Sequence, residues 1–198
     1  MHDKDVRRAL HDKVFREHKG DPNTKVLDEL GLRHGTCRVD IAVVNGYLHG
    51  FEIKSDSDTL ERLPFQVSIY SAVLDRATLV VGEKHAEKSK AYLPDWWGVK
   101  VAITGTGEEI DFEDVQRFKM NPNIDPIALA ELLWRQEALE LLRGIGTAEP
   151  ILRKPRAYLY RQLAASFEIN ALRDAVRHAI KSREGWRGPR PPSSSACS

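Results

Sequence analysis

The chain contains very few cysteines. Only Cys37 and Cys197 are present among its 198 residues, and neither belongs to a CxxC pair. A disulfide framework or a cysteine-based zinc site is therefore not expected, and we expect a reducing, cytoplasmic setting. The seven histidines show no tight pair at ligand spacing, which also argues against zinc.

Long apolar runs are also missing. No stretch approaches the roughly 20 apolar residues that cross a bilayer. The N-terminal segment, residues 1–5, is charged and lacks the apolar core of a signal peptide. The composition is 41% hydrophobic and 30% charged, which is typical of a soluble globular protein and excludes a membrane protein. The length suits one domain, with or without an appendage.

The chain has little net charge, but its charge is unevenly distributed. The total is +1, whereas residues 151–190 contain ten Lys or Arg and three Asp or Glu, so this segment carries +7 and residues 1–150 carry −6. An acidic front and a basic back fit an enzyme that binds metal with its acids and a polyanion with its bases. A basic surface that serves only solubility explains the same pattern.

The spacing of apolar residues predicts an α/β core. We expect a helix, three strands, a second helix and two further strands, over residues 4–18, 25–30, 38–44, 47–54, 63–74, 77–81 and 99–104. This order indicates an α/β sandwich with a mixed sheet. The last two strands, joined across a helix, could pair in parallel.

The sequence beyond residue 120 predicts helices only. Asp125-Pro126 forms a good N-cap and first turn for a helix that runs to Gly144, and two more helices are expected over 156–166 and 170–183. We therefore divide the chain into a core, a basic helical C-terminal extension and a low-complexity tail expected to be disordered, over residues 1–120, 121–187 and 188–198.

The residues most suggestive of chemistry are Asp40, Glu52 and Lys54. Glu52 and Lys54 are two apart on a predicted strand, so both project from one face. A frayed, solvated strand end would explain this pair. Metal chemistry explains it as well, because two carboxylates can hold a hard cation that lowers the pKa of a bound water. Lys54 would then orient or deprotonate that water.

The hairpin at Asn45-Gly46 tests this interpretation. A two-residue turn would place Asp40 opposite Phe51, on the wrong face for Glu52. A three-residue loop over residues 44–46, with Gly46 left-handed in a bulge, would place Asp40 on the face of Glu52. A metal site formed by Asp40 and Glu52 therefore requires an odd-length loop or a bulge.

These residues resemble the PD-(D/E)xK nuclease superfamily, whose restriction-endonuclease-like core has the order αβββαβ. Asp40 and Glu52-Ile53-Lys54 match its motif, although Val39 stands where proline is common. Gln66 and Tyr70 match the QxxxY motif of RecB-like members, and their spacing places both on one helix face. The run 51–63 also resembles an uncharacterised bacterial family described as nucleases.

The resemblance implies a metal site and a set of roles. Asp40, Glu52, Glu29 and the backbone carbonyl of Ile53 would bind Mg²⁺ or Mn²⁺. Lys54, together with the QxxxY residues, would complete a catalytic centre. The implied reaction is metal-dependent hydrolysis of phosphodiester bonds, in DNA rather than RNA.

The last predicted helix carries a basic stripe formed by Arg173, Arg177 and Lys181. It could follow phosphates or be a solvated surface; we expect nucleic-acid contact because the adjoining segment is also basic. Trp96-Trp97 could stack on bases, but aromatic residues after Pro94 are more often part of the core, and Trp134 is also expected in the core.

Two rival functions remain open. One is a non-catalytic nucleic-acid-binding protein that uses a nuclease-like fold and basic C-terminal helices. The other is a structural or interaction protein with an inactive site. The sequence leaves the oligomeric state open, with a homodimer as one possibility, and no membrane partner is expected.

Overall fold

The structure is a computed structural model that describes residues 1–198 except 19, 106, 108, 147–150 and 184–198. Its centre is a six-stranded sheet in the order β1-β2-β3-β4-β5-β6. Strands β3, β4 and β5 pair in parallel, and the other neighbours pair antiparallel. The strands are β1 (Lys25–Leu32), β2 (Cys37–Val44), β3 (Leu48–Lys54), β4 (Arg76–Gly82), β5 (Gly98–Thr104) and β6 (Ile110–Gln116).

The predicted α/β class and mixed sheet are confirmed, including the parallel pairing of the strands at 77–81 and 99–104. The sequence did not predict β6. This edge strand is mostly exposed on both faces, and its acids at positions 111, 113 and 114 obscure the alternation that marks a half-buried strand. It is held by antiparallel pairing to β5.

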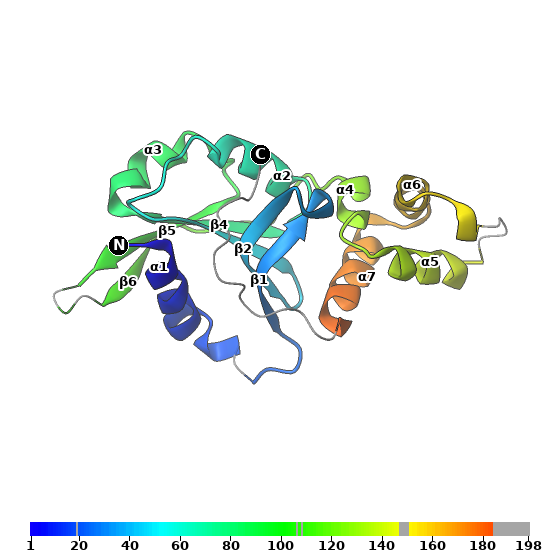
Figure 1. The fold of residues 1–198 in the computed structure, drawn as a ribbon, viewed down its shortest axis with the longest axis horizontal. Coiled ribbons are helices and arrows are strands. Elements are labelled where there is room, and N and C mark those ends of the chain that lie inside the picture. The colour runs from blue at the N-terminus through cyan, green and yellow to red at the C-terminus, as the bar shows by residue number, and fades with distance from the viewer. Residues whose placement is uncertain (19, 106, 108, 147–150, 184–198) are drawn as a thin grey trace.

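Helices cover both faces of the sheet (Figure 1). Helix α1 (Asp3–Ala9) continues through a π-helical turn over Leu10–Val14 and packs Val6, Leu10 and Phe15 into an apolar cluster on one face. Helix α2 (Leu63–Ser71) lies on the other face, where the larger apolar cluster is located. Helix α3 (Ala86–Lys90) lies between β4 and β5 in the chain.

The C-terminal helices form a lobe beside the sheet (Figure 1). The single helix predicted over 126–144 is two helices, because Trp134 has an extended backbone and begins the second one. The side chain of Glu137 accepts a hydrogen bond of 2.7 Å from the N–H of Trp134 and caps this start. Trp134, expected in the core, is 56% exposed. The helices are α4 (Pro126–Ala130), α5 (Arg135–Gly144), α6 (Arg156–Ser166) and α7 (Ile169–Ser182).

The lobe shares its core with the sheet. The larger apolar cluster runs continuously from strand residues such as Leu27 and Leu79 to helix residues such as Leu163 and Ile180. The division of the chain at residue 120 stays a prediction. The tail over 188–198 lies outside the described residues. Within the described part of the chain, no helix is both long and apolar enough to cross a membrane.

Candidate functional site

The register of the β2–β3 hairpin brings the predicted centre together. Val44 pairs with Leu48 and Ile41 pairs with Phe51, so the next step along the ladder sets Asp40 opposite Glu52. The odd-length loop required by the sequence argument is therefore present, but it comprises residues 45–47 rather than 44–46. Gly46 does not have positive φ, so the expected left-handed bulge is wrong.

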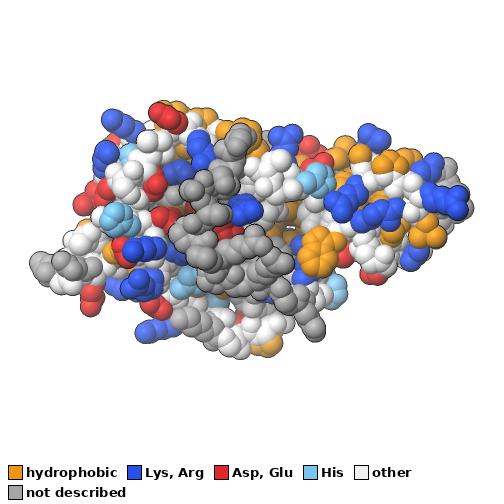
Figure 2. Space-filling model, viewed as in Figure 1, with side chains coloured by type: hydrophobic (Ala, Val, Ile, Leu, Met, Phe, Trp, Pro, Cys, Tyr) orange, Lys and Arg blue, Asp and Glu red, His pale blue; other side chains and the backbone are white. Residues whose placement is uncertain are grey.

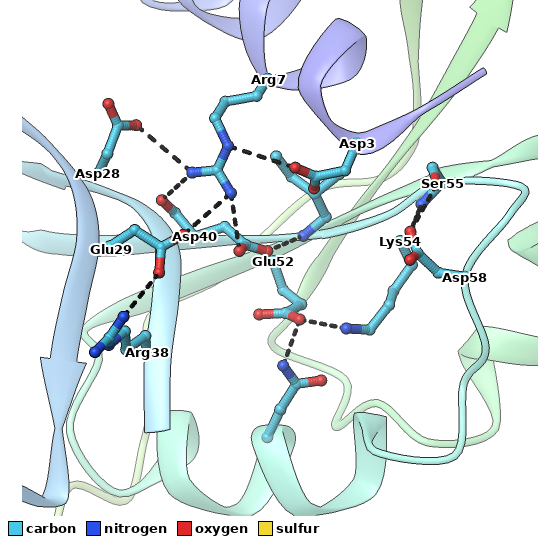
Figure 3. Close-up of polar contacts among 12 residues, drawn as sticks. Asp3, Arg7, Asp28, Glu29, Arg38, Asp40, Glu52, Lys54, Ser55 and Asp58 are labelled. Carbon is cyan, nitrogen blue, oxygen red and sulfur yellow. Dashed lines mark hydrogen bonds and ion pairs between the residues drawn. The ribbon is translucent and has the colours of Figure 1, made fainter. Parts of the chain in front are cut away.

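Glu29 lies beside this pair because of an irregularity in β1. The β1–β2 ladder pairs Asp28 with Ile41 and Leu30 with Val39, and it is interrupted between them at Glu29. Glu29 has φ of 59°, a left-handed conformation that costs an L-residue about 1–2 kcal/mol. The interruption places the Glu29 carboxylate next to that of Asp40 (Figure 3).

Asp40 is held by two donors. Its Oδ2 accepts a hydrogen bond of 2.8 Å from the backbone N–H of Ile53, and its Oδ1 accepts one of 3.0 Å from Arg7. Arg7 also donates to the backbone carbonyl of Asp40 at 2.6 Å. Both carboxylate oxygens of Asp40 are therefore already hydrogen-bonded within the protein.

Arg7 on α1 is the main feature that the sequence analysis missed. Its guanidinium lies within 3.0–3.7 Å of four carboxylates, those of Asp3, Asp28, Glu29 and Asp40 (Figure 3). Burial opposes the charge, but these acids, Asp40 foremost, raise the pKa of the guanidinium above its usual value. The only signal in the sequence was an i,i+4 pair of opposite charges on the first helix.

Glu52 is the most deeply buried of the predicted residues, with 2% of its surface exposed. Its Oε1 accepts hydrogen bonds of 2.5 Å from Lys54 Nζ and from Gln66 Nε2. Its Oε2 accepts one of 2.5 Å from the Tyr70 hydroxyl, which also contacts the carbonyl of Arg38. Gln66 and Tyr70, predicted on one helix face, both donate to Glu52.

The electrostatics of this cluster favour a shared proton or a tight ion pair. Burial, and then the charge of Asp40, raise the pKa of Glu52 to about 7, while Lys54 acts in the opposite direction. Burial disfavours the charge of Lys54, but Glu52 outweighs it and raises the pKa of the ammonium. Burial next to Glu52 also holds the pKa of Tyr70 well above its usual value.

This arrangement does not fit the expected Mg²⁺ or Mn²⁺ ion. A divalent cation needs free carboxylate oxygens that converge on one point, yet the oxygens of Asp40 and Glu52 all accept hydrogen bonds from protein donors. Arg7 places its positive charge among the carboxylates where the ion was expected. Among the described residues, no group of three or more acids, histidines or cysteines is arranged to hold a metal.

The two arginines of the predicted basic stripe on α7 turn toward buried Asp75 rather than toward open solvent. Arg173 Nε lies 3.1 Å from one carboxylate oxygen of buried Asp75, and Arg177 donates to the other at 2.8 Å. Lys181 lies 3.3 Å from the carbonyl of Asn23. Asp75 is buried at the junction of sheet and lobe and also accepts a hydrogen bond of 2.8 Å from the Leu48 N–H. Its buried negative charge requires a positive partner, which the two arginines supply.

A different set of cations faces outward. Arg143 on α5, Arg153 before α6, and Arg156 and Arg161 on α6 are exposed. Within the described part of the chain, none of the four forms an ion pair with an acidic side chain. Figure 2 shows Lys and Arg side chains gathered at the end of this lobe. Arg153, Arg156 and Arg161 belong to the basic segment noted in the sequence, whereas Arg143 precedes it, and none of the four lies on α7.

Comparison with known proteins decides the family. The family model for bacteriophage P4 protein cII matches residues 2–186, nearly the whole chain. The chain belongs to this family. Protein cII of Enterobacteria phage P4 is 26% identical over 160 residues, which cover 80% of this chain and 59% of the relative. No solved structure matches the chain.

The family corrects the function inferred from the resemblance. The identification as a PD-(D/E)xK nuclease is wrong, and so are the metal-dependent nuclease activity, the hydrolase class and the metal-binding role drawn from it. The convergence of Asp40, Glu52 and Lys54 was correctly inferred from strand periodicity. The function assigned to these three residues was not correct, because Arg7 supplies the positive charge next to Asp40 that a metal ion was expected to supply.

Proposed function

We propose that this member of the cII family is a cytoplasmic, non-catalytic nucleic-acid-binding protein that contacts its polymer through the C-terminal helices, with DNA favoured over RNA. The observation that carries the proposal is the outward-facing cation group of α5 and α6. Residues 151–166 include four cations, at positions 153, 154, 156 and 161, and no acid. A cationic surface of this kind attracts the phosphate backbone.

The charge distribution supports the same surface. The stripe on α7 is engaged by Asp75, so its two arginines are not available to a polyanion without breaking that contact. Residues 1–120, which include the sheet, carry −3 and residues 121–150 carry −3, whereas residues 151–166 carry +4, so a phosphate backbone is attracted to the segment around the start of α6 rather than to the sheet. Binding is therefore directed to α5 and α6. The chain spans 59% of its curated relative, so the proposal concerns the part present here.

The test is a salt titration of binding to a labelled duplex, followed by fluorescence anisotropy. The variant combines Arg153→Ala, Arg156→Ala and Arg161→Ala, three exposed side chains. Loss of three phosphate contacts should flatten the slope of log K against log salt by about 2–3 units. The loss should be similar for every sequence tested, because phosphate contacts carry no base information.

A matched control removes three exposed cations from the other end of the molecule, at Lys4, Arg8 and Lys88. This control should leave the slope unchanged within error if the lobe carries the binding. Single-stranded DNA and RNA of equal length test the preference for duplex DNA. Equal effects of the two triple variants, or no measurable binding of the wild type, would contradict the proposal.

A further inference from the structure

Leu152 is unusual among the apolar residues of the lobe. It is 58% exposed, the highest value among the exposed large hydrophobic side chains described. It lies in a short 3-10 turn, Ile151–Arg153, immediately before α6. Its neighbour Ile151 is buried in the main apolar cluster, so the turn is anchored on one side while Leu152 points away from the core.

Hydrogen bonds from α5 and within the turn itself hold the backbone of the turn in place. Arg135 Nη2 on α5 donates to the carbonyl of Leu152 at 2.6 Å and to that of Lys154 at 3.0 Å. The N–H of Lys154 donates to the carbonyl of Ile151 at 3.1 Å, which closes the turn. The backbone at Leu152 is therefore already ordered in the free protein. Binding through Leu152 loses little further backbone conformational entropy.

Three cations follow this leucine closely in the chain. Arg153 and Arg156 are exposed on either side of Pro155, and Lys154 lies 4.9 Å from the ring centre of Tyr158. An exposed apolar side chain with arginines close to it in the chain is a combination that can wedge between base steps while the cations hold nearby phosphates. The surface is the one to which the proposed function assigns nucleic acid.

We propose that Leu152 acts as an apolar wedge that inserts between base pairs of duplex DNA, so that binding bends the duplex. Arg153 and Arg156 hold phosphates near the opened step. This inference rests on the proposed function and adds the mode of binding. An anionic membrane would also attract a leucine among cations, but a single apolar side chain buries far less area than an interfacial helix requires.

The experiment measures end-to-end energy transfer in a duplex of about 20 base pairs carrying a donor and an acceptor dye. Saturating amounts of the full chain should raise the transfer efficiency, because a bend shortens the distance between the ends. Leu152→Ala should abolish most of this rise and weaken binding by less than about tenfold, the effect of losing one partly buried leucine side chain.

Ile127→Ala is the matched control, since Ile127 is 40% exposed on α4 and is not part of the turn Ile151–Arg153. It should bend DNA as the wild type does. Binding without a rise in transfer, or an unchanged rise in Leu152→Ala, would overturn the wedge while leaving the proposed function intact. Absence of binding to any DNA would overturn both. Leu152-dependent binding to phosphatidylserine vesicles without DNA bending would overturn the wedge in favour of a membrane.

Discussion

At the scale of single residues, the polar centre is a set of compensated charges. Arg7 faces four carboxylates and Lys54 faces Glu52, so each buried ion has a partner of opposite sign. Such pairs are costly to break, because removing one partner leaves the other uncompensated in a low-dielectric environment. Substitutions in this polar centre should therefore change the free energy of unfolding.

The pH dependence of stability should report on Glu52. Its pKa is about 7 in the folded protein, against an ordinary value of 4.5. The folded state thus binds this proton more tightly, and the stability that Glu52 contributes is fully present below pH 4.5 and lost as pH rises through 7. Relative to the wild type, Glu52→Gln should gain about 3 kcal/mol of unfolding free energy between pH 4 and pH 8.

The measurement is urea denaturation of both proteins at several pH values. Buried His49 titrates with the opposite sign, because burial lowers its pKa to about 3. Its contribution is common to both proteins and cancels in the difference. A difference in unfolding free energy that stays constant across this pH range would show that Glu52 keeps an ordinary pKa.

Arg7 provides a second test at this scale. Arg7→Ala leaves four carboxylates facing one another, and we expect it to lower the unfolding free energy by about 2–3 kcal/mol, allowing for partial solvent screening. Arg8→Ala, one position along the same helix, is the control because its side chain is 73% exposed. Equal stability of the two variants would contradict the structural role of Arg7.

At the scale of elements, helix α7 is attached to the sheet by polar contacts as well as apolar ones. Asp75 accepts from Leu48 and pairs with Arg173 and Arg177. The ammonium of Lys25 on β1 contacts the last carbonyls of α7, at Lys181 (3.0 Å) and Arg183. These groups replace the intrahelical partners that the end of a helix lacks.

Asp75→Ala should therefore loosen α7 specifically. The substitution leaves two arginines and one backbone N–H without their partner. We expect a loss of about 3–5 kcal/mol in unfolding free energy. Amide hydrogen exchange of α7 should accelerate more than that of the central strands. Asp174→Ala is the control, because Asp174 is 76% exposed and pairs with Arg177 at the surface, so its effect should stay within about 0.5 kcal/mol.

Local sequence signals were sufficient for most of the strands and for the condition that an odd-length loop puts Asp40 and Glu52 on one face, but they did not give the register itself. They failed where contacts between residues far apart in the sequence determine how a side chain is oriented. The orientation of Arg173 and Arg177 depends on Asp75, about one hundred residues away, and the role of Asp40 depends on Arg7. The end of α4 before Trp134 is set by a side-chain cap that overrides the helical periodicity of the segment.

At the scale of the whole molecule, charge is separated between the two ends. The acidic centre of the sheet is internally neutralised by Arg7 and Lys54, whereas the cations of α5 and α6 point outward. A resemblance based on Asp40, Glu52 and Lys54 emphasised the first region. The exposed cations of the second region are the ones on which the proposed nucleic-acid contact rests.

The most direct test of the account incubates the pure protein with end-labelled duplex DNA in the presence of Mg²⁺. Each sample is then run on a native gel and on a denaturing gel. The account predicts a retarded complex on the native gel and full-length strands on the denaturing gel. Shortened strands that disappear when EDTA is added, or no retarded complex at low salt, would contradict it.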